Sequence, residues 1–191
     1  IVKMNVIIFG PPGAGKGTQS NFISKKFNLL KLSTGEILRD QIKQKTDLGI
    51  KISPIINSGA FVSDEIVSEL IEKVIKDKKN YNRIIFDGYP RSLAQAKNLD
   101  NLLVKYKQKI GIVLKLSVTL ETIKKRISER RNLENRPDDS EEIAVKRYET
   151  YEKSTEPVIE YYKKLNLLKV INGERSIHQI NNEISDIINL I

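Results

Sequence analysis

Short apolar runs alternate along the chain with longer segments whose apolar residues recur every three or four positions. The short runs are rich in β-branched residues, a pattern typical of buried parallel strands. They cover residues 4–9, 29–32, 83–87, 112–116 and 168–171. Because helical segments separate them, the pattern predicts an α/β fold: a five-stranded parallel sheet covered by helices on both faces, in three α/β/α layers.

The helical segments have ends that can be read from the sequence. The expected helices cover residues 15–27, 34–45, 48–57, 64–76, 92–105 and 120–131, a long segment to about 165, and a last helix from about 176. Ser63 suits the N-cap of the helix over 64–76, and Asp139 and Glu142 have the spacing of a capping box for the long segment. Pro157 interrupts that segment, which predicts a kink or two helices.

Composition fits one water-soluble domain. The chain has 191 residues, 39% hydrophobic and 30% charged, and no apolar run approaches the roughly 20 residues of a membrane helix. It contains no Cys, which excludes disulfides and Cys-based zinc sites, and its one His, His178, lacks partners for a metal site.

The net charge of +9 leaves nucleic-acid binding open as an alternative. The lysines are spread along the chain, however, and they are not interleaved with aromatic residues as base-stacking surfaces require. We therefore expect small anionic ligands, and neither nucleic acid nor membrane as a partner.

The first strand is followed by GPPGAGKGT, residues 10–18. Glycines let backbone N–H groups face an anion, the helix that begins near Gly15 adds its positive end, and Lys16 can reach the β- and γ-phosphates. A glycine-rich turn without a ligand is the alternative, but the strand before the loop and the helix after it favour a phosphate site. Gly17 stands where a phosphate loop usually has the Ser or Thr that binds Mg²⁺.

Asp87 ends the third apolar run, the position of the acidic residue that holds Mg²⁺ in phosphate-loop enzymes. Since Gly17 has no hydroxyl, we expect phosphate oxygens, water and Asp87 to hold the metal, with Asp87 acting through water. A plain Asp-Gly turn is the alternative. Gly88, not an acidic residue, follows Asp87, which argues against ATP hydrolysis and for transfer to an organic acceptor.

Three motifs in order resemble the adenylate kinase family, within the nucleoside monophosphate kinases: GPPGAGKGT, STGEILR at 33–39 and DGYPR at 87–91. The resemblance continues through the later arginines and Gly173, so it covers nearly the whole chain. It implies a P-loop fold and reversible phosphoryl transfer from MgATP to AMP, giving two ADP, in adenine nucleotide homeostasis.

The resemblance also implies the site residues. For ATP these are Gly13, Ala14, Gly15, Lys16, Gly17, Thr18, Arg126, Arg130 and Arg175. For AMP they are Thr34, Arg39, Ala60, Phe61, Val62, Gly88, Tyr89, Pro90, Arg91, Gln95, Arg136 and Arg147. The catalytic residues are Lys16, Arg91, Arg130, Arg136 and Arg147.

Two of these assignments have alternatives. Arg126 and Arg130 are spaced to form an exposed i,i+4 helix face, and Phe61 and Val62 suit packing within a small subdomain. Arginine suits nucleotide binding because its planar, permanently charged guanidinium group can donate two hydrogen bonds to one phosphate. Thr34 favours AMP over UMP or CMP by family comparison, and the Gln95 amide suits an adenine edge.

The chain is expected to form one domain, 1–191, in three parts. The core comprises 1–32, 63–128 and 140–191, the helical monophosphate-binding subdomain 33–62, and a short lid loop 129–139. The lid has no room for an inserted β-rich, zinc-bearing form, so we expect Mg²⁺ and no zinc. Both small parts should close over the nucleotides to exclude water. We expect a cytoplasmic monomer.

Other classes of protein remain as alternatives. They are a kinase for UMP, CMP or a small non-nucleotide alcohol, a hydrolytic or non-catalytic phosphate-loop switch, and a basic nucleic-acid-binding module.

Overall fold

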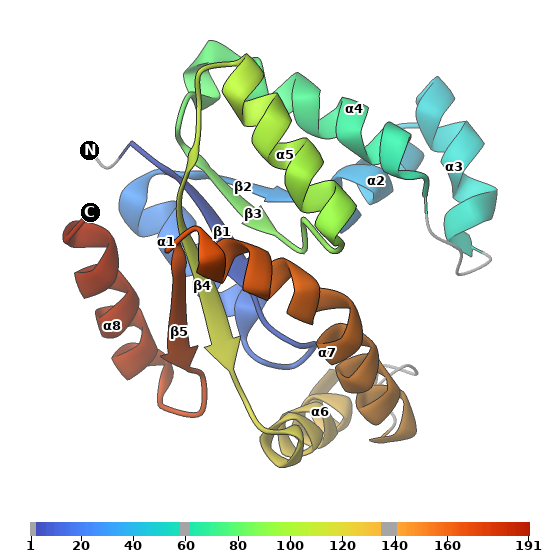
Figure 1. Cartoon of the computed structure of the whole chain (residues 1–191). Coiled ribbons are helices and arrows are strands. Elements are labelled where there is room, and N and C mark those ends of the chain that lie inside the picture. Colours follow the sequence, from blue (N-terminus) through green and yellow to red (C-terminus); the bar gives the residue numbers. More distant parts are fainter. Residues whose placement is uncertain (1–2, 58–61, 135–140) are drawn as a thin grey trace.

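The computed structural model describes residues 3–57, 62–134 and 141–191 (Figure 1). Its strands are β1 (Asn5–Phe9), β2 (Leu30–Ser33), β3 (Ile84–Asp87), β4 (Ile110–Ser117) and β5 (Leu168–Asn172). They form one parallel sheet in the order β2-β3-β1-β4-β5, with β1 in the centre. The predicted five-stranded parallel sheet is confirmed, with β4 longer at both ends than expected.

The helices of the described ranges also follow the predicted order. They are α1 (Lys16–Phe27), α2 (Thr34–Lys43), α3 (Asp47–Asn57), α4 (Asp64–Ile75), α5 (Leu93–Lys105), α6 (Leu120–Glu134), α7 (Glu141–Lys164) and α8 (Ile177–Asn189), with a 3₁₀ turn η1 (Lys78–Asn80). In this part of the chain, no helix has the length and apolar composition to cross a membrane.

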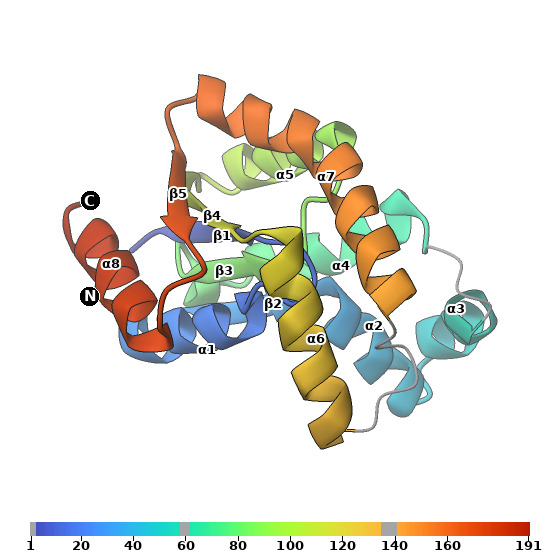
Figure 2. The same ribbon diagram turned by 90° about the horizontal axis from the view of Figure 1, so that it is seen from below.

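One helix, α6, is clearly longer than predicted, and the interruption predicted in α7 takes the form of a bend. α6 continues to Glu134 instead of ending near Arg131, because Glu, Arg and Leu are good helix formers and no Gly or Pro intervenes. α7 is one helix with Pro157 inside it, and Figure 2 shows it bending along its length. Of the two predicted alternatives, the kinked single helix is therefore confirmed. The capping box predicted from Asp139 lies outside the described residues.

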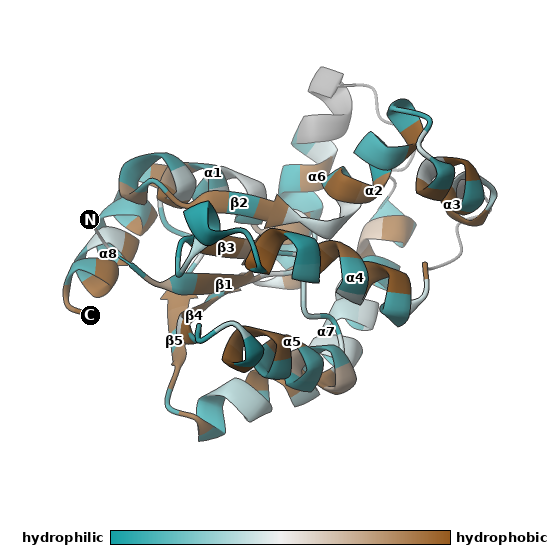
Figure 3. Cartoon of the chain, turned by 90° about the horizontal axis from the view of Figure 1, so that it is seen from above, coloured by the Kyte–Doolittle hydropathy of each residue, from teal (hydrophilic) through white to brown (hydrophobic). Residues whose placement is uncertain are grey.

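Alternation along the strands divides the core into two clusters, one on each face of the sheet. On β1, Val6 and Ile8 pack with α1 and α8, whereas Ile7 and Phe9 pack with α4, α5 and α7. Figure 2 shows α1 and α8 on one side of the sheet and α5 and α7 on the other, and Figure 3 shows hydrophobic strands between them. These are the three layers that the sequence predicts.

All strands point to one edge of the sheet, so every loop that follows a strand lies there (Figure 1). This edge carries the loop between β1 and α1, the turn after β3 at Asp87, and the start of α2. α6 lies beside the same edge, below β4 in the view of Figure 1. Ligands of open parallel sheets bind at this edge, so the fold gathers the predicted motifs into one region.

Candidate active site

The loop between β1 and α1 has the backbone of an anion-binding turn. Gly13 and Gly15 have positive φ angles of 87° and 88°, and Gly15 is the N-cap of α1. Apart from the adjacent residues and the backbone of α1 itself, no atom lies within 4 Å of a Cβ added at Gly15 or Gly17. Open space therefore lies beside the N-terminal turn of α1, where backbone N–H groups and the helix dipole favour an anion.

The other side of this loop is packed against α6. An added Cβ on Gly13 would lie 3.3 Å from Ile127 Cγ1, and the buried Ala14 joins the same core cluster. The Arg126 guanidinium donates to the carbonyl of Ala14 at 3.2 Å and to that of Gly173 at 2.7 Å. Arg126 thus ties α6 to the phosphate loop and to the loop after β5.

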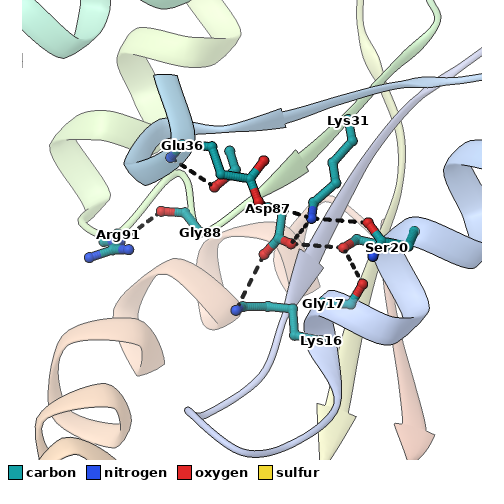
Figure 4. Close-up of polar contacts among 10 residues, drawn as sticks. Lys16, Gly17, Ser20, Lys31, Glu36, Asp87, Gly88 and Arg91 are labelled. Atoms are coloured by element: carbon teal, nitrogen blue, oxygen red, sulfur yellow. Dashed lines mark hydrogen bonds and ion pairs between the residues drawn. The ribbon is translucent and has the colours of Figure 1, made fainter. Parts of the chain in front are cut away.

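Asp87, at the end of β3, is the centre of a polar cluster (Figure 4). The residue is only 7% exposed. Lys16 Nζ lies 3.3 Å from Oδ1, Lys31 Nζ lies 3.8 Å from Oδ2, and the Ser20 hydroxyl donates to Oδ2 at 2.8 Å. The structure therefore brings Lys16 and Asp87 together, as their strand-end positions predict.

Lys31 and Ser20 were not identified from the sequence. Lys31 lies on β2, where it also contacts Asn21 Oδ1 at 3.1 Å and Glu36 Oε1 at 3.4 Å. The signal that could have found Lys31 is a lone cation inside an apolar strand next to the strand of Asp87. For Ser20, it is a hydroxyl one turn after Lys16 on the helix that faces β3.

The turn after Asp87 is held by its own residues. Gly88 has a φ of 78°, and its carbonyl accepts from Arg91 Nε at 2.7 Å. The Gln95 side-chain carbonyl accepts from the Arg91 backbone N–H at 2.7 Å, and its amide group donates to Asp64 at 2.6 Å. Burial raises the pKa of Tyr89, which packs beneath this turn together with Pro90. The Arg91 side chain is exposed beside the Asp87 cluster (Figure 4).

The start of α2 adds a third strand-end motif. The Ser33 hydroxyl caps the helix by accepting from the Glu36 N–H at 3.5 Å. Thr34 is the first helical residue, half-buried, and Arg39 lies one turn further with its guanidinium over Gly35. These residues lie on the element that follows β2, the neighbour of β3 in the sheet.

The remaining predicted site residues lie on several other elements, apart from the Asp87 cluster. Arg175 follows β5 and pairs with Glu183 of α8, and Arg147 is exposed on α7. Val62 is half-buried against the cluster of α4, α5 and α7. Arg130 is on α6, one turn after Arg126. Thr18 is exposed on the first turn of α1. Ala60, Phe61 and Arg136 lie outside the described residues.

Asp87 fits a magnesium site with one protein carboxylate. Mg²⁺ is commonly held by one or two carboxylates, with water and phosphate oxygens completing six positions. Within residues 3–57, 62–134 and 141–191, no three His, Cys, Asp or Glu side chains converge to hold a metal by themselves. A metal here would depend on a phosphate ligand, and the space next to Gly15 and Gly17 is where such a ligand fits.

The arrangement can therefore hold a phosphate chain between a helix N-terminus, a lysine and a metal-binding carboxylate. Arg91 lies on the turn that follows Asp87, with its side chain exposed. Such a site binds and positions transferring phosphates without a covalent intermediate.

Comparison with known proteins gives one family. The family model described as adenylate kinase matches residues 8–167. An adenylate kinase of Pelagibacter ubique is 44% identical, covering 97% of this chain and 99% of the relative. One from Prochlorococcus marinus strain MIT 9515 is 42% identical over 96% and 97%, and one from Thermus thermophilus is 42% identical over 90% of each chain.

The lengths of these alignments differ. The alignment with the Pelagibacter protein spans 211 positions, more than the 191 residues of this chain, so that relative has residues without a counterpart here. The Prochlorococcus alignment spans 184 positions.

Proposed function

This chain belongs to the adenylate kinase family, and from that premise we propose how its residues divide the work of the reaction. The enzyme transfers the γ-phosphoryl group of ATP to AMP, reversibly and with Mg²⁺, and forms two ADP. An oxygen of the AMP phosphate forms a bond to the γ-phosphorus while the bond to the β,γ-bridging oxygen breaks. Negative charge spreads over the transferring group, so catalysis is mainly positioning and charge stabilisation.

The donor nucleotide binds at the β1–α1 loop. The backbone of residues 13–18 surrounds the β- and γ-phosphates, and Lys16 turns from Asp87 toward them. The open space beside Gly15 and Gly17 supports this placement. Arg126 and Arg130, one turn apart on α6, and Arg175 after β5 border the ATP side, with Arg175 beside the adenine.

The acceptor nucleotide binds between α2 and the turn after β3. Thr34 and Arg39 come from α2, and residues 88–91 form the opposite wall. Gln95 faces the adenine: the structure uses one N–H and one carbonyl lone pair of its amide, which leaves one of each for the base edge. Ala60, Phe61 and Val62 complete the adenine side.

The transferring phosphoryl group lies between the two nucleotides. Arg91 reaches it from the β3 turn, Arg130 from α6 and Arg147 from α7, and Arg136 comes from the lid. Guanidinium groups suit this task because each can donate to two phosphate oxygens.

Mg²⁺ bound with ATP neutralises the phosphate charge. Asp87 holds it through water, and Ser20 orients the Asp87 carboxylate by donating to Oδ2. Without a hydroxyl at Gly17, the metal takes its other ligands from phosphate and solvent. No residue set for zinc is proposed.

The parts 33–62 and 129–139 close over AMP and ATP, and the remaining residues form the core. Only five residues, RNLEN, separate Arg130 from Arg136, which supports a short lid in this chain. Closure requires free surface on both small parts, which supports a monomer. We further propose that it acts on free ATP, AMP and ADP in the cytoplasm, without nucleic acid or membrane as a partner.

The observation that carries this proposal is the meeting of Lys16 and Asp87, 3.3 Å apart, at the open end of the phosphate loop. The test is ADP formation from MgATP with AMP, UMP, CMP or no acceptor, with Lys16→Ala as the comparison variant. Turnover should require AMP and fall by orders of magnitude in the variant. Equal ADP formation without an acceptor would indicate an ATPase, and faster turnover with UMP or CMP would move the enzyme to another monophosphate.

A further inference from the structure

A cavity of about 670 Å³ lies at the opposite edge of the sheet from the phosphate loop. It is bounded by the end of α4, by η1 and the start of β3, and by the connection between α5 and β4, which lie at the upper end of the molecule in Figure 1. Because the strands are parallel and the phosphate loop follows β1, this cavity is separated from the active site by the length of the sheet.

The lining of this cavity is strongly basic. Six of its ten residues are Lys or Arg, and none is acidic, although the chain as a whole has 24 acidic to 33 basic residues. The six are Lys3, Lys76, Lys78, Lys79, Arg83 and Lys107. An even scatter of lysines over the surface would also bring acidic residues into the lining, so the cavity is a local concentration of positive charge.

Most of this charge is not neutralised by neighbours. Lys79 forms a salt bridge with Asp77 at 3.1 Å, and Arg83 donates to the carbonyl of Asn28. The other four cations have no salt-bridge partner among the residues that the structure describes. The nearby Glu72 is held by Lys105 at 2.6 Å and by the Tyr106 hydroxyl at 2.7 Å. These hydrogen bonds lower the pKa of Glu72, and the charges of Lys105 and Lys76 lower it further.

The walls of the cavity are held by hydrogen bonds, and those of Gln108 with Ile75 and with Asn5 are buried. The Gln108 amide donates to the Ile75 carbonyl at 2.8 Å and accepts from the Asn82 N–H at 3.0 Å and from Asn5 at 3.2 Å. The Tyr81 hydroxyl donates to the Lys107 carbonyl at 2.8 Å, which joins the two loops across the opening. The cavity is therefore preformed, and a ligand would not have to order it.

We propose that this cavity is a second anion site, which binds a small molecule carrying three or more adjacent phosphate charges. Its volume is within the range of about 300–1,000 Å³ typical of small-molecule sites. Four cations without salt bridges exceed what a single phosphate would match, and ammonium groups are suited to phosphate oxygens. The concave shape favours a small ligand over a duplex or a membrane. A nucleoside triphosphate and an inorganic oligophosphate share the required chemistry.

The test is a titration followed by ¹⁵N–¹H NMR, which reports where each ligand binds. The wild-type protein is titrated with inorganic tripolyphosphate and, separately, with ATP, at about 150 mM salt so that weak surface attraction is screened. The amides of residues 76–83 and 106–108 should shift saturably with a Kd below about 1 mM. The variant Lys16→Ala should leave this titration unchanged, which separates the cavity from the active site and from the function proposed above.

A charge-matched pair of triple variants tests whether the lysines of the cavity, and not the net charge of the protein, bind the ligand. Lys76→Gln, Lys78→Gln and Lys107→Gln together should raise the Kd at least about tenfold. Lys97→Gln, Lys153→Gln and Lys164→Gln, three exposed helical lysines outside the cavity, remove the same charge and should change the Kd less than about twofold. Dispersed spectra confirm that both triple variants are folded.

Tripolyphosphate and ATP binding equally tightly supports a free oligophosphate, and tighter binding of ATP supports a nucleotide whose base contacts Tyr81 or Tyr106. Absence of saturable shifts at these amides, or equal weakening in both triple variants, overturns the proposal. Binding of an RNA oligonucleotide or of anionic vesicles at these amides, with neither phosphate ligand binding, also overturns it.

Discussion

Replacing Gly49 by Ala should force helices α2 and α3 apart. An added Cβ at Gly49 would lie 1.9 Å from the carbonyl oxygen of Gln41 and 2.4 Å from its carbonyl carbon. Both are backbone atoms, so no side-chain rotation relieves the overlap. Reaching 3.0 Å, below which Cβ contacts are essentially never found, requires a displacement of at least 1.1 Å.

The size of the effect follows from two opposing contributions. Overpacking at backbone atoms costs about 3 kcal/mol, and Ala is a better helix former than Gly by about 1 kcal/mol. The net loss of about 2 kcal/mol should lower the Tm by about 4–8 °C for a domain of this size. Because α2 also carries Thr34 and Arg39, the KM for AMP should rise about tenfold, while the KM for ATP should change less than about twofold.

The measurement is thermal unfolding together with initial rates at varied AMP and varied ATP. Ile50→Ala is the matched control, since Ile50 is the next residue of α3 and is 64% exposed; it should leave both quantities nearly unchanged. If Gly49→Ala has the wild-type Tm or a higher one, with an unchanged KM for AMP, the close crossing of α2 and α3 is refuted. Equal increases in both KM values would instead refute the separation of 33–62 from the ATP side.

Three further changes test the site and the fold. Arg91→Ala should lower kcat at least about 100-fold, since a positioned charge on the transferring group is worth several kcal/mol; a near-normal rate in a coupled ADP assay would exclude Arg91 from catalysis. Ser20→Ala removes the hydroxyl that donates to Asp87 at 2.8 Å, so the Mg²⁺ concentration at half-maximal rate should rise about fivefold; an unchanged Mg²⁺ titration would contradict this role. Burial raises the pKa of Asp100 above its ordinary value of 3.8, and its partner Tyr161 can donate equally to an amide oxygen. The folded wild type therefore holds the Asp100 proton more tightly and loses stability as pH rises above about 4. The stability of Asp100→Asn relative to wild type, measured by urea unfolding, should thus increase as pH rises from about 4; a pH-independent difference would argue against the shift.

The fold could be predicted because each strand has a local signature. Each expected strand is a short apolar run bounded by glycine or polar residues, and parallel strands buried on both faces need no alternation to be recognised. The phosphate loop and Asp87 were found for the same reason, since both come directly after such a run. Helix ends were less certain: no Gly or Pro marks an end near Arg131, so α6 continues to Glu134.

The contacts that could not be predicted join residues far apart in the chain. Ser20 and Asp87 are 67 positions apart, and they meet because β1 places α1 against β3. The basic cavity joins Lys76 and Lys107, which looked like scattered surface charge in the sequence. Gly49 carries no turn signal, and only the crossing of two helices reveals why a side chain does not fit there. The first two features depend on the strand order of the sheet and the third on how two helices cross, and hydrophobic periodicity specifies neither.

Lys31 is a second cation beside Asp87, so the carboxylate does not depend on Lys16 alone. A buried carboxylate that loses its only cation is costly, often by several kcal/mol. If Lys16 were the sole partner of Asp87, moving it to the phosphates of ATP would leave that cost uncompensated until Mg²⁺ arrived. With Lys31 3.8 Å from Oδ2 and Ser20 donating to the same oxygen, Asp87 keeps a cation and a hydrogen bond while Lys16 moves. In the proposed function, Oδ1, which faces Lys16, would then be the oxygen free to hold a water of the bound Mg²⁺.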